Sequence, residues 1–481
     1  MNYRLISNTL GSVLWVEGGF LLLPLIPALC YRDGCAVIFL YAAAICMILG
    51  TLLRAVPVRN RRLQGRDGYA AVALAWVVLV LFGALPYLFS GAIPHYANAI
   101  FETVSGMTTT GATILTSVET LPKSILFWRS ETQWMGGMGV LVLFLALMPK
   151  LSDGAVYLMR AESPGPIKSK LVPKLGDTAK IMYSIYISLT ALEAIALRIA
   201  GMTWFDAVNH AFTTLATGGF STHDSGIGGF ESNAIVWIVI VFTFLAGVNF
   251  GLMFVALCGK WRQVLRSEEL RVYTLIVVLA MALICVDLWL QCGEHFGQSV
   301  TDAAFQVTTI ITTTGYATRD FAQWPVFSQC ILAVLMVVGG CAGSTAGGMK
   351  LSRVMLLIKN MNREVKKVVH PNRVGVITID GQLVEERAVS GAQAFSMAYA
   401  AVLVIGALIV SWDNLGVTES LTASLTCISN VGPGLGLLGP MENFSILSDV
   451  SKYVLSLIML MGRLELMPLL VLFIPATWRG K

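Results

Sequence analysis

The chain has 481 residues, of which 56% are hydrophobic and only 13% are charged, and its formal net charge is +5. Its mean hydropathy is +0.74. An average soluble domain carries about 25% charged residues, so this composition excludes a soluble globular protein and a soluble domain held by a single anchor. Apolar runs such as Ile235–Cys258 recur along the sequence and reach the ~20 residues that a membrane-spanning helix needs. The composition predicts an all-α, polytopic membrane protein.

The N-terminal part of the chain predicts a pair of membrane helices. One apolar stretch runs from Leu10 to Leu29 and contains Glu17, and a second, Ala36–Leu53, follows almost at once. An acidic residue inside the first stretch and an immediate second span are not typical of a removable signal peptide.

Basic residues divide the rest of the chain into units. After Arg4, Lys and Arg gather at 54–66, 150–180, 260–271, 350–387 and 479–481. Loops rich in Lys and Arg stay on the cytoplasmic side of a membrane, so the sequence between two clusters must cross outward and return. This topology predicts cytoplasmic N- and C-termini, and it explains the clusters without requiring that they bind nucleic acid or lipid headgroups. The units are the helix pair 1–66 and four repeats, 67–170, 171–266, 267–380 and 381–481.

Each repeat has a polar middle, and the four middles align on one glycine without gaps. They read NAIFETVSGMTTTG (98–111), DAVNHAFTTLATGG (206–219), DAAFQVTTIITTTG (302–315) and ESLTASLTCISNVG (419–432). The first residue of each segment suits a helix N-terminus, by capping for Asn and Asp and by its charge for Glu. We therefore expect a helix to begin at Asn98, Asp206, Asp302 and Glu419.

These segments are too short to cross a membrane. Thirteen helical residues extend about 20 Å, against about 30 Å of hydrocarbon. Such a segment can enter the membrane and turn back only where its end is buried in protein or lines water. We expect four re-entrant pore loops to meet around one axial pathway and to point their partly negative helix ends at a cation. The expected pore loops are 98–113, 206–223, 302–318 and 419–436.

The glycine after each short helix is a candidate filter residue. Backbone carbonyls that all face an axis need unusual dihedral angles and close approach, which glycine permits, and carbonyl rings can replace the hydration shell of a cation. Taken alone, each glycine is better explained as a helix C-cap or a turn. The shared register of the four glycines favours the filter, and in repeat 2 it favours Gly219 over Gly218. The candidate ion-binding residues are Thr109, Thr110, Gly111, Thr217, Gly218, Gly219, Thr313, Thr314, Gly315, Asn430, Val431 and Gly432. Glu102 and His210, within the short helices, are expected to be hydrogen-bonded behind the filter.

The segments TTTGAT (108–113), ATGGFSTH (216–223), TTTGYAT (312–318) and SNVGPG (429–434) resemble the four pore loops of the Trk/Ktr/HKT superfamily of K⁺-translocating proteins. The similarity covers residues 70–475, and the helix pair at 9–55 resembles the extra pair of its TrkH branch rather than the shorter KtrB branch. The resemblance implies four helix–pore loop–helix repeats with pseudo-fourfold symmetry around one pore. Sodium-selective plant members replace the first filter glycine with serine, so Gly111 points to K⁺.

The second helix of repeat 3 contains the glycine-rich stretch VVGGCAGSTAGGMK (337–350), which disfavours a continuous helix. The spacing of its glycines and lysine does not meet the GxxxxGK[ST] pattern of a phosphate loop. The resemblance implies that residues 339–350 form an intramembrane gating loop.

Arg463 lies in the last apolar span, 456–473, where a charge is expensive and a functional candidate. It could instead pair with a carboxylate or reach an interface, although Glu465, two residues on, projects in a different direction on a helix. The resemblance implies that Arg463 faces the gating loop and restrains resting flux. The candidate gate residues are Gly339, Gly340, Gly343, Ser344, Thr345, Gly347, Gly348, Lys350 and Arg463.

The favoured function is K⁺ uptake across the cytoplasmic (inner) membrane through a carbonyl-lined filter. The alternatives are an Na⁺- or H⁺-coupled K⁺ symporter and, as a different class, an intramembrane enzyme, which would need paired ionisable residues that the sequence does not display. We expect no enzyme, no cofactor bound by the chain itself, and K⁺ as the only metal ion, held by filter carbonyls. The resemblance implies a homodimer on cytosolic TrkA-like RCK subunits, which would bind the regulatory nucleotide. The basic segments would be the docking surfaces for these subunits, with binding of anionic lipid as the alternative.

Overall fold

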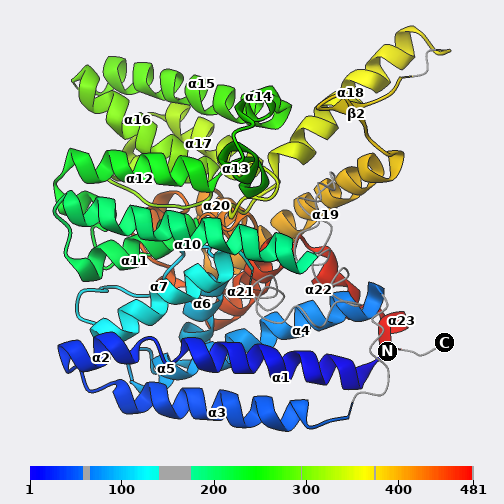
Figure 1. Cartoon of the computed structure of the whole chain (residues 1–481). Helices are drawn as coiled ribbons and strands as arrows, with labels where there is room; N and C mark the ends of the chain where they lie inside the picture. Colours follow the sequence, from blue (N-terminus) through cyan, green and yellow to red (C-terminus); the bar gives the residue numbers. More distant parts are fainter. Residues whose placement is uncertain (58–64, 140–174, 294, 373–374, 479–481) are drawn as a thin grey trace.

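The computed structural model describes residues 1–57, 65–139, 175–293, 295–372 and 375–478. Within these ranges the chain is mostly helical, and the N-terminus and α23, the last described helix, lie at the same end of the molecule as α18 (Figure 1). A short hairpin pairs β1 (Thr378–Ile379) with β2 (Gln382–Leu383), with Thr378 opposite Leu383 and Ile379 opposite Gln382. Its two-residue turn, Asp380–Gly381, has positive φ at both positions, as the Asp-Gly type I′ turn requires.

The predicted N-terminal helix pair is present. It consists of α1 (Tyr3–Phe20), continued by α2 (Leu25–Tyr31), and α3 (Ala36–Arg54). A Cβ added to Gly11 or Gly50 would meet the carbonyl oxygen of the other at under 3.0 Å. The two glycines therefore set how closely these helices approach each other.

Four successive sets of helices follow. Repeat 1 has α4 (Gly65–Gly83), α5 (Leu85–Phe89), α6 (Tyr96–Met107) and α7 (Lys123–Gly137). Repeat 2 has α10 (Leu175–Ile199), α11 (Trp204–Leu215), η1 (Gly226–Phe230), α12 (Asn233–Ala246), α13 (Phe250–Leu257) and α14 (Trp261–Arg266). Repeat 3 has α15 (Glu268–Gln291), α16 (Phe296–Ile311), η2 (Phe321–Gln323), α17 (Val326–Val338) and α18 (Leu351–Val369). Repeat 4 has α19 (Glu386–Val410), η3 (Ser411–Asp413), α20 (Val417–Ser429), η4 (Gly436–Leu438), η5 (Phe444–Ile446), α21 (Asp449–Arg463), α22 (Met467–Leu472) and α23 (Pro475–Trp478).

Of the expected boundaries between units, one falls inside a helix, one between two helices and one in a hairpin turn. The boundary at 66/67 lies just inside α4, and that at 266/267 separates α14 from α15. The boundary at 380/381 lies in the turn of the β-hairpin. The boundary at 170/171 lies outside the described residues.

The short pore helices α6, α11, α16 and α20 begin earlier than the sequence predicted, so the expected N-caps Asn98, Asp206 and Asp302 were wrong. Glu419 lies in the first turn of α20, as its charge suggested. Their N-cap residues are His95, Thr203, His295 and Gly416. In α11 the hydroxyl of Thr203 accepts a hydrogen bond from the backbone N–H of Asp206 at 3.1 Å. Asp206 instead lies in the first turn, where negative charge complements the helix dipole. With 12 to 16 residues, the pore helices still fall short of the ~30 Å hydrocarbon thickness.

Six helices in the described part of the chain are long and apolar enough to cross a membrane, or seven if α12 and α13 count as one span. The run Ile235–Cys258 is not one straight span, because α12 and α13 meet at an angle of 98°. The predicted span 456–473 is also broken. Glu465 and Leu466 both have positive φ, which ends α21 at Arg463 and starts α22 at Met467.

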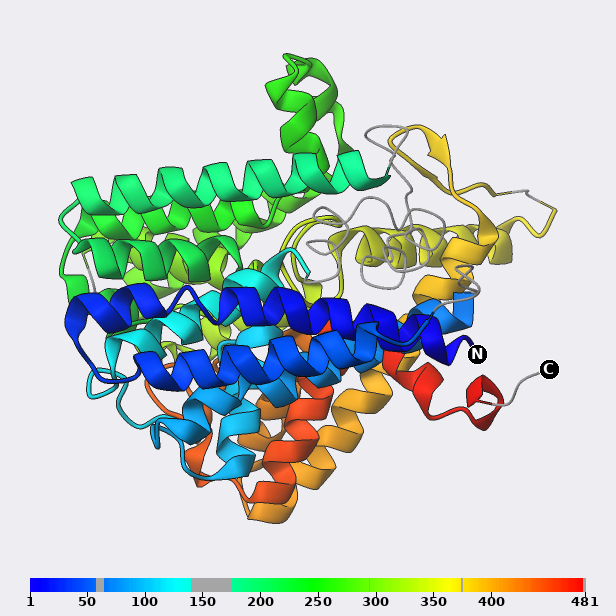
Figure 2. The same ribbon diagram turned by 60° about the horizontal axis from the view of Figure 1, so that its bottom comes forward.

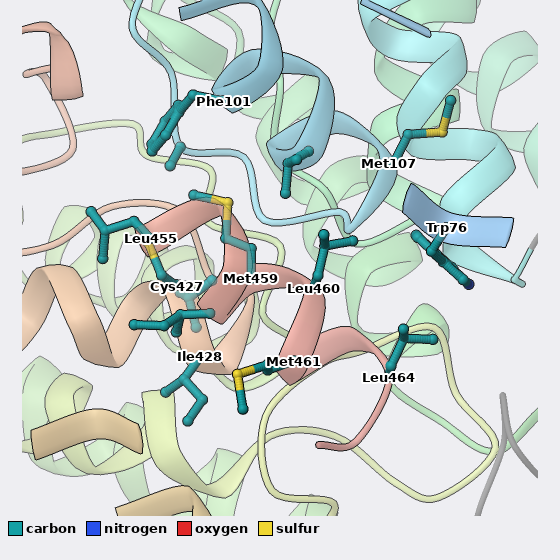
Figure 3. Packing of buried hydrophobic residues seen from close by; sticks show 14 of the residues in the cluster. Trp76, Phe101, Met107, Cys427, Ile428, Leu455, Met459, Leu460, Met461 and Leu464 are labelled. Carbon is teal, nitrogen blue, oxygen red and sulfur yellow. The ribbon is translucent and has the colours of Figure 1, made fainter. Parts of the chain in front are cut away.

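The repeats close into a ring. The second helix of each repeat packs against the pore helix of the next: α7 against α11, α12 against α16, α17 against α20, and α21 against α6. Figure 3 shows the last of these contacts. There Met459 and Leu460 of α21 lie between Ile428 of α20 and Met107 of α6. Because repeat 4 contacts repeat 1, the four pore helices surround a common centre.

Candidate functional site

All four pore helices end in the same backbone motif. The residue two before the aligned glycine has φ between 55° and 58°, and its N–H bonds to the carbonyl three residues back. The next N–H bonds to the carbonyl five residues back at 2.8–2.9 Å in every repeat. This is a Schellman motif, whose left-handed position is usually glycine or asparagine. Here the left-handed residues are Thr109, Thr217, Thr313 and Asn430.

Three of these left-handed positions hold a β-branched residue, which is a backbone outlier. Such conformations cost about 1–3 kcal/mol each and persist where the surroundings fix them, often at functional sites. The residue after each one has negative φ, and the aligned glycine that follows is again positive, with φ of 83°, 78°, 75° and 110° along the chain. The four loops therefore share one conformation, and Gly219 rather than Gly218 is the structural equivalent in repeat 2.

The aligned glycines meet as a ring. Each aligned glycine faces a backbone carbonyl of a neighbouring repeat, and that carbonyl belongs to the residue that precedes the neighbour's own aligned glycine. A Cβ added to any of the four glycines would come within 3.0 Å of the oxygen of this carbonyl. Each glycine and the residue whose carbonyl it faces are Gly111 with Gly218, Gly219 with Thr314, Gly315 with Val431, and Gly432 with Thr110. The order runs from repeat 1 to 2, 3, 4 and back to 1. Any side chain at these positions would push into a backbone carbonyl of the neighbouring loop.

Several carbonyl oxygens in this ring have no donor. Those of Thr110, Thr314 and Val431 accept no hydrogen bond from the described residues, and neither do those of the four aligned glycines. Buried carbonyls are normally satisfied. The aligned glycines also line one cavity of about 180 Å³. A ring of unsatisfied carbonyls beside a cavity can coordinate a dehydrated cation.

Gln133 of α7 holds the second pore loop and was not singled out in the sequence. Its Nε2 donates to the carbonyl of Gly218 at 2.7 Å, and its Oε1 accepts from the N–H of Phe220 at 3.1 Å. The side chain is fully buried. One amide thus fixes the backbone on both sides of Gly219 from the neighbouring repeat.

A buried ion pair joins the first two loops. Arg129 Nε lies 2.6 Å from Glu102 Oε1, with side chains 4% and 0% exposed. Glu102 also accepts hydrogen bonds from Thr113 and from the N–H of Ile114, at 3.0 Å each. Arg129 donates to the carbonyl of Ser221 at 3.2 Å. The expected hydrogen bonding of Glu102 is confirmed.

Other contacts link the remaining loops. A ring nitrogen of His210 lies 3.0 Å from the Ser221 hydroxyl, which confirms the expected hydrogen bonding of His210. The hydroxyl of Tyr316 in loop 3 bonds that of Thr213 in the pore helix of repeat 2. The Nδ2 of Asn430 donates to the Thr110 hydroxyl at 2.9 Å, joining loop 4 to loop 1.

The predicted gating segment, 339–350, is non-helical between α17 and α18. Gly339, Gly343 and Gly348 have positive φ. The carbonyl of Gly340 accepts from Leu351 at 3.0 Å, and Lys350 Nζ donates to the carbonyls of Ser344 and Ala346. The segment therefore folds back on itself as a compact loop.

This loop contacts its own repeat and the two neighbouring repeats. The N–H of Gly347 donates to the Thr313 hydroxyl at 2.6 Å, and a Cβ added to Gly347 would collide with the carbonyl oxygen of Ser429. The Thr345 hydroxyl donates to the carbonyl of Ala246 at 3.2 Å. The loop thus contacts pore loop 3, pore helix 4 and the bend between α12 and α13.

Arg463 also binds this loop, through hydrogen bonds from its guanidinium group to backbone carbonyls. Its Nη1 donates to the carbonyl of Thr345 at 2.9 Å, and its Nη2 donates to the carbonyls of Gly136 and Gly137 at the end of α7. Glu465 pairs instead with Arg353 of α18, as the poor geometry between Arg463 and Glu465 suggested. One guanidinium therefore connects repeats 1, 3 and 4 at the level of the loop.

A sequence profile of the TrkH family, described as "Cation transport protein", matches residues 37–479. The chain belongs to the TrkH family.

Relatives of this TrkH-family chain include the Trk system potassium uptake protein TrkH of Salmonella typhimurium, 40% identical over 486 residues that cover 100% of both chains. The protein of the same name from Escherichia coli is 39% identical with the same coverage, and the E. coli Trk system potassium uptake protein TrkG is 30% identical over 99% of both chains. The fold matches the crystal structure of the potassium transporter TrkH from Vibrio parahaemolyticus with a TM-score of 0.90, 36% identity and 100% coverage of both chains.

These similarities confirm the predicted family, the all-α polytopic membrane fold, and the prediction of a transport protein rather than an enzyme. The chain is thus a multi-pass membrane protein. The family match extends beyond the residues 70–475 that carried the resemblance, to 37–479, and includes α3 of the helix pair.

Proposed function

We propose that this chain conducts potassium ions into the cell through a pore whose filter is the ring of four aligned glycines and the carbonyls that they face. The relatives named above are potassium uptake proteins. The observation that carries the proposal is the closed order of glycine-to-carbonyl contacts around the four repeats. Carbonyls without donors at this ring can replace water around K⁺, and the pore-helix C-termini point partly negative charge toward it.

The ion-binding residues in this proposal are the three positions that end each Schellman motif and reach the glycine: 109–111, 217–219, 313–315 and 430–432. Their common conformation supports equal roles in the four repeats. The carbonyl of Gly218 differs from the equivalent carbonyls of the other three repeats because it already accepts a hydrogen bond from Gln133.

The proposed gate is the loop 339–350 together with Arg463. Its contacts with Thr313 and with the backbone of Ser429, beside Asn430, support a gate adjacent to the proposed filter. The three backbone carbonyls that Arg463 binds hold the loop against α7. Movement of α18, which begins at Leu351 directly after the loop, would draw the loop away.

The regulatory setting is also a proposal. The relatives are named as parts of a Trk system, which supports assembly with other components. We propose a homodimer in the cytoplasmic membrane, with both termini and α18 on the cytoplasmic side and TrkA-like RCK subunits binding nucleotide there. The shared location of the N-terminus, α23 and α18 at one end of the molecule supports this orientation (Figure 1).

The decisive experiment is K⁺ and Na⁺ flux in liposomes that contain the purified full-length protein. Gly315→Ser should collide with the Val431 carbonyl and lower K⁺ selectivity or abolish flux. Gly391→Ser is the matched control, because Gly391 is exposed in α19 and a Cβ there meets nothing within 4 Å. Flux that needs no Na⁺ or H⁺ gradient would favour the pore over a symporter. Wild-type selectivity and rate in Gly315→Ser would contradict the proposed filter.

A further inference from the structure

Two short helices, α13 and α14, connect repeat 2 to repeat 3. After α12, the chain turns by 98° into α13. Gly259, with φ of 77°, then allows the turn toward α14, and α15 starts at Glu268. Figure 2 shows α13 and α14 in green, projecting across the direction of the long helices. We call α13–α14 (residues 250–266) the finger. Since α15 is a candidate membrane span, the finger lies next to a membrane boundary.

One side of the finger is a basic hollow. A cavity of about 1020 Å³ is lined by Lys260, Arg262, Arg266, Arg271 and, as the one acidic residue, Asp380. Asp380 Oδ1 accepts a hydrogen bond from the N–H of Glu268 at 2.6 Å. In the described part of the chain none of the four cations forms an ion pair with a carboxylate. On α18, by contrast, Lys359 pairs with Glu268 and Arg363 with Glu386.

Exposed apolar side chains flank these cations. Leu257, Trp261 and Leu265 are 74%, 61% and 67% exposed. In water this apolar surface would be unfavourable. At a membrane interface, however, Trp is enriched at headgroup level, and a short helix with apolar and cationic faces lies in the plane of the surface. The exposed apolar side chains next to these cations therefore fit a lipid surface better than a protein partner.

We propose that the basic hollow of the finger binds the phosphate of an anionic phospholipid in the inner leaflet. The proposal rests on the membrane orientation proposed above, but not on the identity of the transported ion. Lys260, Arg262, Arg266 and Arg271 surround the phosphate. Trp261 and Leu265 enter the headgroup and acyl boundary. Basic pockets beside membrane helices on the cytoplasmic side bind anionic headgroups in this way.

The test uses the full-length protein in detergent, with phosphatidylglycerol or phosphatidylcholine added and bound lipid counted by native mass spectrometry. Wild type should retain phosphatidylglycerol in preference to phosphatidylcholine. Arg262→Gln/Arg266→Gln should weaken phosphatidylglycerol binding about 25-fold, because each cation near an anionic surface contributes about fivefold. Lys260→Gln should weaken it about fivefold.

The matched control is Lys366→Gln/Lys367→Gln, which removes the same charge from two exposed positions near the end of α18. Its lipid binding should stay at the wild-type level. Equal loss in this control, or wild-type binding in Arg262→Gln/Arg266→Gln, would overturn the proposal. So would displacement of the lipid by millimolar inorganic phosphate, which would indicate a soluble anion. A loss of dimer with no loss of lipid would indicate that the finger faces a second copy, and would also overturn it.

K⁺ flux of the same preparations in phosphatidylcholine vesicles separates this proposal from the proposed function. The finger lies outside the ring and the gating loop, so the variants should conduct as wild type does, which also shows that they are folded. Absence of K⁺ flux in wild type would contradict the proposed function and leave the lipid result standing.

Discussion

The backbone N–H of Gly347, in the loop that interrupts the second helix of repeat 3, donates a hydrogen bond to the hydroxyl of Thr313 at 2.6 Å. Thr313 is the left-handed residue that ends pore helix α16. Thr313 therefore belongs to the proposed filter and, through its hydroxyl, also binds the proposed gate.

Thr313→Val keeps the branched shape of the side chain and removes the acceptor for Gly347. We expect resting K⁺ flux without any cytosolic partner to rise about fivefold, since a hydrogen bond contributes about 1 kcal/mol net. Flux from liposomes is the measurement. Thr109→Val is the matched variant, because Thr109 has the same backbone conformation and its buried hydroxyl has no partner in the described structure. An equal rise in both variants would show that the Gly347 contact is not the cause.

Arg463→Gln removes the charge that binds carbonyls of Gly136, Gly137 and Thr345. Hydrogen bonds to charged groups contribute about 1.5–3 kcal/mol each, so we expect a rise in resting flux of at least about tenfold. Arg463→Lys, which keeps the charge but cannot reach several carbonyls at once, should show an intermediate rise. Unchanged uptake in Arg463→Gln, with and without the regulatory partner, would reject the gating role.

Gln133→Met keeps the length of the side chain and releases the carbonyl of Gly218 and the N–H of Phe220. Leaving buried polar groups unsatisfied costs about 1–3 kcal/mol. We expect lower thermal stability in detergent and a lower K⁺-to-Na⁺ permeability ratio from reversal potentials. Gln382→Met, at an exposed position in β2, should change neither quantity. A permeability ratio equal to wild type in Gln133→Met would mean that loop 2 keeps its shape without this side chain.

Glu102→Gln breaks the buried pair with Arg129. Removing one partner of such a pair costs about 3–5 kcal/mol, because a charge is left buried without compensation. Chemical unfolding in mixed micelles should report a loss of this size. Glu102→Gln/Arg129→Gln should recover part of the stability, since neither charge remains. A double variant less stable than the single one would indicate that Arg129 acts mainly through Ser221 and the Phe220 ring.

The sequence by itself determined the membrane character, the N-terminal helix pair, the fourfold repetition and the register of the aligned glycines. These are local properties. Hydropathy sets which segments enter the membrane, and a backbone with positive φ close to a neighbouring carbonyl requires glycine wherever it occurs. The glycine-rich break at 339–350 was predictable for the same reason, since five glycines within ten residues disfavour a continuous helix.

Only the tertiary structure decided which groups hold the loops. Gln133 acts on a loop 85 residues away, and nothing near it in the sequence marks that contact. The partners of Arg463 are backbone carbonyls, which every residue possesses, so no side-chain pattern could identify them. The pore helices begin before the polar residues that resemble caps. Asp206 and Glu419 lie in the first turn of their helices instead, where negative charge also complements the helix dipole. The bend between α12 and α13 was not predicted either, because its apolar sequence is also compatible with one straight membrane span. The close approach of Gly247 to Tyr273 and Thr312 arises only when the repeats assemble.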